Sequence, residues 1–82
     1  MEIWQMKEKI VEIIKNMKQD QEFEVDTDLV EEGILDSFDI ANLIIELEQE
    51  FEIEISGLDI IPENFSTVES MIRLIEKYRR AS

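Results

Sequence analysis

Ser37 is the side chain whose type and position most suggest chemistry in this 82-residue sequence. It directly follows Asp36, a favourable N-cap residue, and precedes a run with helical periodicity, so we expect it in the first turn of a helix. Free backbone N–H groups and the positive end of the helix dipole stabilise a phosphate at such a turn. An Asp-Ser pair before a helix is most often a simple cap, and this alternative stays open. A phosphoester on the Ser37 hydroxyl is the chemical interpretation.

Catalytic partners for this hydroxyl are missing from the sequence. The chain contains no histidine, the commonest general base and transition-metal ligand, and no cysteine for a thiolate, a disulfide or a zinc site. Without a histidine to activate it, the Ser37 hydroxyl is unsuited to act as a nucleophile. We therefore expect the chain to be modified by another enzyme, to have no enzymatic activity of its own and to hold no metal.

Two long helices and the loop between them are predicted to position this serine. Apolar residues recur at helical spacing from residue 2 to about residue 18, with lysine and glutamate on the opposite face. The periodicity is lost between residues 19 and 36, which predicts a long loop with a turn at Gly33. A second helix is predicted from Ser37 to Phe51. Apolar residues scattered through the loop indicate that it packs across the helices.

The last third of the chain is predicted to add a link and two further helices. Ile53 and Ile55 alternate with glutamates and are expected to form an extended link that plugs the core. A short helical piece is expected over residues 58–61, bracketed by Gly57 and Pro62. The last helix is predicted to open at Ser66, because Ser66-Thr67-Val68-Glu69 fits a capping box. The expected fold is all-α: one domain, residues 1–82, with three main helices and one short helix in a four-helix bundle.

The predicted second helix carries two apolar stripes, although one buried face needs only one. The core stripe comprises Ile40, Leu43, Ile44, Leu47 and Phe51. The second stripe comprises Phe38, Ala41 and Ile45, at positions i, i+3 and i+7. Acidic side chains separate the two stripes: Asp39, Glu46, Glu48 and Glu50. Either the long loop covers the second stripe, or this stripe is exposed for a partner with an apolar groove and a basic rim.

The charge of the chain is −13 and is unevenly distributed. All eight basic residues lie in the two end segments, which together carry +4, whereas residues 19–72 carry −17. Such a field attracts basic partners and repels nucleic acid, although solubility alone would also explain an acidic surface. Neither a membrane-spanning run nor a signal peptide is recognisable, so we expect a cytoplasmic protein, by default a monomer, that does not insert into membranes.

Calcium binding is a further hypothesis, because Asp26-Thr27-Asp28 matches the start of an EF-hand loop. The remaining ligand spacing is missing, and Glu31 occupies the sixth position, where the loop needs glycine. We therefore reject a dedicated calcium site. An acidic helical protein-interaction module with no prosthetic group stays open as an alternative to a modified protein.

The residues around Ser37 also carry a family resemblance. The run Glu-Glu-Gly-Ile-Leu-Asp-Ser-Phe-Asp at residues 31–39 resembles the phosphopantetheine attachment motif of acyl carrier proteins. In that motif a glycine, an apolar pair and Asp-Ser-Leu precede an acidic helix. The similarity continues through Ile53 and Ile55 to Thr67-Val68 and covers essentially the whole chain.

This resemblance implies that a magnesium-dependent phosphopantetheinyl transferase moves 4'-phosphopantetheine from coenzyme A onto Ser37. The thiol of that arm would hold an acyl or aminoacyl group as a thioester for fatty acid, polyketide or related biosynthesis. Asp36 occupies the position of the aspartate that helps the transferase recognise the site. The family's docking positions correspond to Phe38, Ala41 and Ile45, with Asp39, Glu46 and Glu48 near its acidic contacts. The implied partners are a loading ligase and synthases or transferases with basic docking patches.

Details of the resemblance bear on the type of carrier. The form Leu-Asp-Ser-Phe at residues 35–38 is also similar to D-alanyl carrier proteins of teichoic acid modification, which is the alternative function. The segment 56–65 differs from theirs, and the Gly-Gly pair of peptidyl carriers is absent. The resemblance therefore favours a specialised stand-alone carrier.

Overall fold

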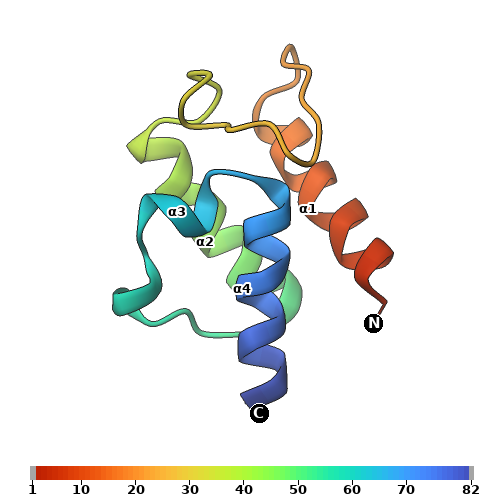
Figure 1. The fold of residues 1–82 in the computed structure, drawn as a ribbon, viewed down its shortest axis with the longest axis vertical. Helices are drawn as coiled ribbons and strands as arrows, with labels where there is room; N and C mark the ends of the chain where they lie inside the picture. Colours follow the sequence, from red (N-terminus) through yellow and green to blue (C-terminus); the bar gives the residue numbers. More distant parts are fainter. Residues whose placement is uncertain (1, 82) are drawn as a thin grey trace.

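The computed structural model describes residues 2–81, which form a helical bundle without strands (Figure 1). There are three long helices, with a 3-10 turn, η1, and one short helix between the last two. In chain order the elements are α1 Ile3–Met17, α2 Ser37–Phe51, η1 Gly57–Asp59, α3 Pro62–Phe65 and α4 Val68–Ala81. The predicted all-α fold, with a long loop between its first two helices, is confirmed. Of the domain predicted over residues 1–82, Met1 and Ser82 lie outside the described residues.

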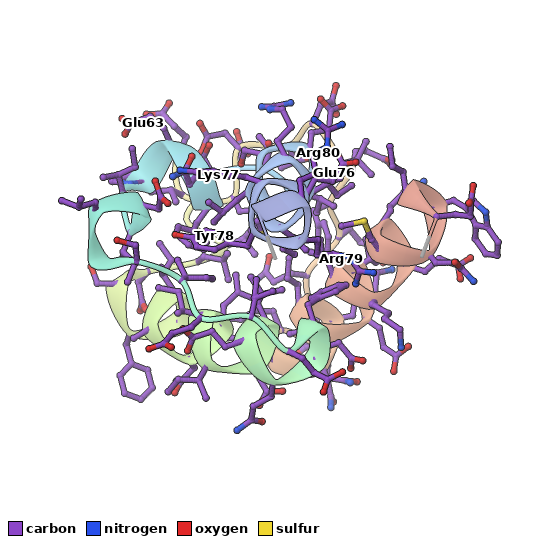
Figure 2. All side chains as sticks on the ribbon, turned by 90° about the horizontal axis from the view of Figure 1, so that it is seen from below. Glu63, Glu76, Lys77, Tyr78, Arg79 and Arg80 are labelled. Carbon is purple, nitrogen blue, oxygen red and sulfur yellow. The ribbon has the colours of Figure 1, made fainter. Side chains whose placement is uncertain are left out.

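The core lies between the three long helices, each of which contributes its apolar stripe. Seen along the axis of α4, α2 and α4 lie on opposite sides of this core and α1 closes a third side (Figure 2). Fully buried side chains come from all three helices: Ile10, Ile14, Leu43, Leu47, Val68, Met71 and Ile75. Within residues 2–81, no helix has both the length and the apolar character that crossing a bilayer requires.

The loop before α2 is anchored at Leu29, whose side chain is fully buried. The Leu29 N–H donates to the Ser66 carbonyl at 2.6 Å, and its own carbonyl accepts the N–H groups of Ile34 and Leu35, both at 2.9 Å. Gly33 has a φ of +75°, a conformation that glycine adopts without strain. Because both of its backbone groups are engaged, Leu29 fixes the path by which the loop reaches Asp36. The prediction that this loop packs across the bundle is confirmed.

The link after α2 is extended, as expected, and Ile55 is buried in the core. The predicted short helical piece is present as η1, which ends at Asp59 instead of residue 61, and a second short helix, α3, begins at Pro62. Proline suits this first helical position because its fixed φ matches the helix and its missing N–H is not needed there. Pro62 therefore starts a helix, whereas the sequence predicts it at the end of one.

The capping box at the start of α4 also differs from the predicted one. The Thr67 hydroxyl accepts the Ser70 N–H at 3.0 Å, and the Ser70 hydroxyl accepts the Thr67 N–H at 3.2 Å. This reciprocal pair replaces the predicted pair of Ser66 and Glu69. The Ser66 hydroxyl instead donates to the Glu63 carbonyl at 3.3 Å, which helps to close the end of α3.

Candidate functional site

The first turn of α2 is built by two carboxylates on either side of Ser37. The Asp36 carboxylate accepts the Asp39 N–H at 2.9 Å, and the Asp39 carboxylate accepts the Asp36 N–H at 3.2 Å. This capping box confirms Asp36 as the N-cap of the helix. Ser37, the first helical residue, is exposed, and no other residue in the described part of the chain forms a hydrogen bond with its hydroxyl. The turn therefore presents a free hydroxyl at the positive end of a helix.

Lys18, the residue that follows α1, contacts this turn. Its ammonium lies 2.8 Å from Asp39 Oδ2 and forms an ion pair with that carboxylate. The hydrogen bond from Lys18 is the largest cause that lowers the pKa of Asp39, and burial opposes it. The same bond raises the pKa of Lys18, with a further contribution from the charge of Asp36. Sequence analysis missed this contact, because Lys18 and Asp39 are far apart in the chain and no spacing rule joins them.

The second apolar stripe of α2 is exposed to solvent. The Phe38 side chain is 75% exposed and Ile45 is 51% exposed, whereas Leu43 and Leu47 of the core stripe are fully buried. Ala41, between Phe38 and Ile45, is also exposed. The alternative in which the long loop covers this stripe is therefore wrong. An apolar strip on a helix surface is available to a partner.

The acidic residues predicted to flank this stripe lie in three different environments. Glu46 is exposed. Glu48 is half-buried, and its carboxylate accepts the Ile55 N–H at 2.9 Å, which ties the extended link to α2. The Asp39 carboxylate is engaged by Lys18 and by the Asp36 N–H. Of the three, Glu46 is the carboxylate without such an internal bond in the described chain, so docking roles for Glu48 and Asp39 stay predictions.

An open groove of about 470 Å³ runs beside Ser37 between α2 and α3. Its lining is almost entirely apolar and consists of Ser37, Ile40, Ala41, Ile44, Ile60, Ile61, Pro62 and Phe65. Sequence analysis did not predict this groove. Four of its lining residues come from the segment after η1, and no periodic pattern relates that segment to α2.

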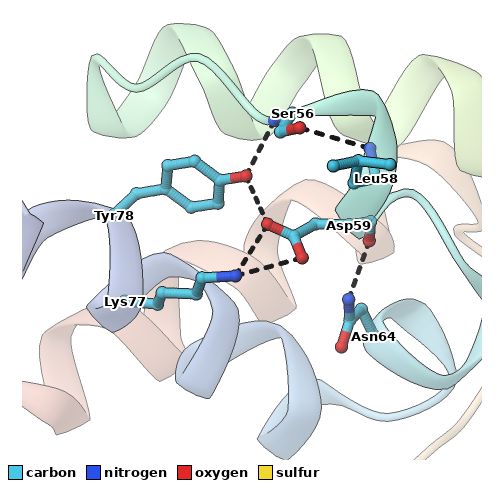
Figure 3. A network of polar contacts seen from close by, with 6 residues as sticks. All are labelled: Ser56, Leu58, Asp59, Asn64, Lys77 and Tyr78. Carbon is cyan, nitrogen blue, oxygen red and sulfur yellow. Dashed lines mark hydrogen bonds and ion pairs between the residues drawn. The ribbon is translucent and has the colours of Figure 1, made fainter.

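A polar network connects α4 to the segment that lines the groove on the side opposite α2 (Figure 3). The Tyr78 hydroxyl donates to the Asp59 carboxylate at 2.5 Å and accepts the Ser56 N–H at 2.7 Å. The Lys77 ammonium binds both oxygens of the same carboxylate, at 2.9 and 3.1 Å. The Asn64 side chain donates to the Asp59 carbonyl at 2.7 Å. These contacts fix η1 at both ends, and with it the isoleucines that line the groove.

The network also shifts the titration of its members. The hydrogen bond from Tyr78 is the largest cause that lowers the pKa of Asp59, followed by the bond from Lys77. Burial and the bond to Asp59 raise the pKa of Tyr78. Figure 2 shows Tyr78 on the inner side of α4 and Arg80 on the outer side. Asp59 therefore keeps its charge to a lower pH than a free aspartate does, which preserves its bonds to Tyr78 and Lys77.

Comparison with protein families identifies the class of this helical bundle. Residues 5–75 match the family described as the phosphopantetheine attachment site, and this span includes most of α1, all of α2, the groove and the first part of α4. The chain belongs to this family of carrier proteins. The predicted cofactor, a phosphopantetheine group, is confirmed at the level of the family, as is the expectation of a carrier that other enzymes act on.

Three curated relatives are D-alanyl carrier proteins from species of Bacillus. The chain is 31% identical over 77 residues to the protein of Bacillus mycoides (strain KBAB4), and 30% identical to those of Bacillus cereus (strain B4264) and Bacillus anthracis (strain CDC 684 / NRRL 3495). Each alignment covers 92% of this chain and 98% of the relative. The segment 56–65 lies within the aligned span, so its divergence does not interrupt the similarity.

Proposed function

We propose that Ser37 is the residue that receives 4'-phosphopantetheine and that the chain carries an acyl or aminoacyl thioester to partner enzymes. The observation that carries this proposal is the exposed Ser37 hydroxyl, free of internal hydrogen bonds, at the N-terminus of α2. A modifying enzyme can therefore reach the hydroxyl without unfolding the turn.

The residues around Ser37 fit a phosphopantetheine group. A phosphate on the hydroxyl would lie at the positive end of α2, where negative charge is stabilised. The apolar groove that begins at Ser37 can accept the arm or part of its cargo, because it is open along its length. When bound, the group supplies the thiol that this cysteine-free chain lacks. Asp36 and Asp39 stabilise the first turn. The second stripe, Phe38, Ala41 and Ile45, is the surface on which we expect partners to dock.

The partners that this function needs are a phosphopantetheinyl transferase and a loading enzyme. The exposed stripe of α2 and the exposed Glu46 favour enzymes with an apolar patch rimmed by arginine or lysine. Because the modification draws on coenzyme A, we place the protein in the cytoplasm. Asp36, next to the hydroxyl, is the residue we expect the transferase to recognise.

The test is the intact mass after incubation with coenzyme A, magnesium and a phosphopantetheinyl transferase of broad specificity. We expect the wild type to gain one phosphopantetheine and Ser37→Ala to gain none. Ser56→Ala is the matched control, because Ser56 is also exposed and caps a helical turn, and it should be modified fully. A folded wild type without any gain would instead support the acidic interaction module with no prosthetic group.

A D-alanyl cargo is the more specific candidate, because the three relatives are D-alanyl carrier proteins. The modified protein would be incubated with ATP and a D-alanine-activating ligase, and in parallel with a fatty-acyl ligase and a fatty acid. A D-alanyl mass gain, reversed by hydroxylamine as thioesters are, supports this cargo. Transfer of the fatty acid alone would favour the acyl carrier of fatty acid or polyketide biosynthesis.

A further inference from the structure

Lys18 is the basic side chain that pairs with the turn presenting Ser37. Its ammonium contacts Asp39 at 2.8 Å, and Asp39 is joined to Asp36 by two reciprocal hydrogen bonds. The contact is partly shielded, because the side chains of Lys18 and Asp39 are 31% and 14% exposed. One cation therefore pairs with Asp39 directly and is connected to Asp36 through the capping box that encloses Ser37.

A phosphodiester on Ser37 would create a charge conflict at this turn. It adds one negative charge next to Asp36 and Asp39, within the segment 19–72 that carries −17 and no basic residue. The dipole of α2 offsets part of this repulsion, but its effect is equivalent to about half a charge at the N-terminus. The positive charge of Lys18, which pairs with a carboxylate of this turn, can offset the remaining repulsion.

We propose that Lys18 is a positioning residue for the prosthetic group, whose ammonium compensates the charge of Asp39 so that the turn accepts a phosphodiester on Ser37. This inference rests on the proposed function, because it concerns the modified form. In the unmodified form Lys18 pins the end of α1 to the start of α2. After modification the same ammonium stabilises the folded turn further, because the negative charge there has increased.

The ion pair of Lys9 and Glu50 provides a matched control. It also connects α1 to α2, with a distance of 3.2 Å, and it lies near the other end of α2. Both pairs therefore contribute to the packing of the same two helices. Only the pair of Lys18 lies at the turn of Ser37, so the two lysines should respond differently to modification.

The experiment measures urea unfolding of the unmodified and modified forms of the wild type, Lys18→Gln, Lys18→Arg and Lys9→Gln at low salt. Mass spectrometry first establishes the modification of each sample. We expect Lys18→Gln to raise the unfolding equilibrium constant about two- to fivefold more in the modified form than in the unmodified one, the size of an exposed ion-pair interaction. Lys9→Gln should act equally on both forms, and Lys18→Arg should restore the wild-type response.

The outcomes separate this inference from the proposed function. An equal effect of Lys18→Gln on both forms, with modification complete, overturns the inference and leaves Lys18 as a structural pin between helices. A difference of the same size in Lys9→Gln also overturns it, because the effect would then be general to the helix pair. Absence of the mass gain in every variant overturns the proposed function itself.

Discussion

Asp36 caps the start of α2 and Thr67 caps the start of α4. Each exchanges two hydrogen bonds with the residue three positions later in the sequence. The sequence predicted Asp36 as the N-cap and Asp39 in the first turn, and the structure adds the reciprocal bond between the two. Around Thr67 two overlapping boxes are possible in Ser66-Thr67-Val68-Glu69-Ser70. The choice between them depends on a distant contact, since the Ser66 carbonyl accepts the Leu29 N–H. Local patterns do not contain this information.

Asp59 offers a test of pH dependence at a single residue. Its pKa is lower in the folded state because Tyr78 and Lys77 bind its charged form. The stability it contributes is therefore present above its unfolded pKa, near 4, and is lost as pH falls through the lower folded value. We expect Asp59→Asn to be less stable than the wild type at neutral pH, and this difference to shrink steadily below about pH 4.

Urea unfolding at a series of pH values checks this expectation. Asp26→Asn is a suitable control, because Asp26 is a loop aspartate that forms no side-chain hydrogen bond within the described chain. A stability difference for Asp59→Asn that stays constant from neutral pH to pH values well below 4 would show that the charge of Asp59 is not what the network stabilises.

At the scale of the elements, α2 serves the core and the surface with two different faces. Its bounds and both of its apolar stripes could be predicted, because periodicity and capping act within one helix. The exposure of the second stripe could not be predicted, since it depends on the path of the loop, which is fixed by the burial of Leu29 and its bond to Ser66. The groove beside Ser37 also escaped prediction, because the side opposite α2 is formed by α3 and the two isoleucines before it, which are distant from α2 in the sequence.

The two faces of α2 predict opposite effects for two similar substitutions. Ile45→Ala removes exposed apolar surface, so we expect the free energy of unfolding to change by no more than about 0.5 kcal/mol. We expect kcat/KM of the transferase or loading enzyme to fall about fivefold or more if Ile45 anchors the interface. Leu47→Ala creates a cavity in the core and should cost about 2–5 kcal/mol of stability.

Kinetic assays and urea unfolding on the same preparations separate these effects. Phe38→Ala should behave like Ile45→Ala, because its side chain is also exposed on the second stripe. Unchanged kinetics in both exposed variants would remove the second stripe from the docking surface and leave the acidic margins as the remaining candidates.

For the whole molecule, the charge of −13 sets how stability responds to salt. Repulsion among the acidic residues of segment 19–72 destabilises the compact state, and salt screens it. The three ion pairs within the described chain would weaken under the same conditions, but each is partly exposed and contributes little. We expect the midpoint of thermal unfolding to rise by several degrees between about 20 mM and about 500 mM NaCl.

Thermal unfolding followed by circular dichroism gives this measurement directly. Sodium chloride and sodium fluoride should act alike if screening is the cause, since both are simple monovalent salts. A flat or falling midpoint would mean that the acidic residues are too far apart in the fold to destabilise it, whatever their number in the sequence.

The arrangement of the helices gives the acidic charge a direction. Four of the basic residues lie on α4 and three on α1, whereas α2 carries none and lies across the core from α4 (Figure 2). The molecule therefore has a permanent electric dipole in addition to its net charge. The field of a basic enzyme would exert a torque on this dipole and turn α2 toward the enzyme before the two surfaces touch. Ser37 and the second stripe would then face the partner at the first encounter. This shortens the rotational search that otherwise limits the rate of association.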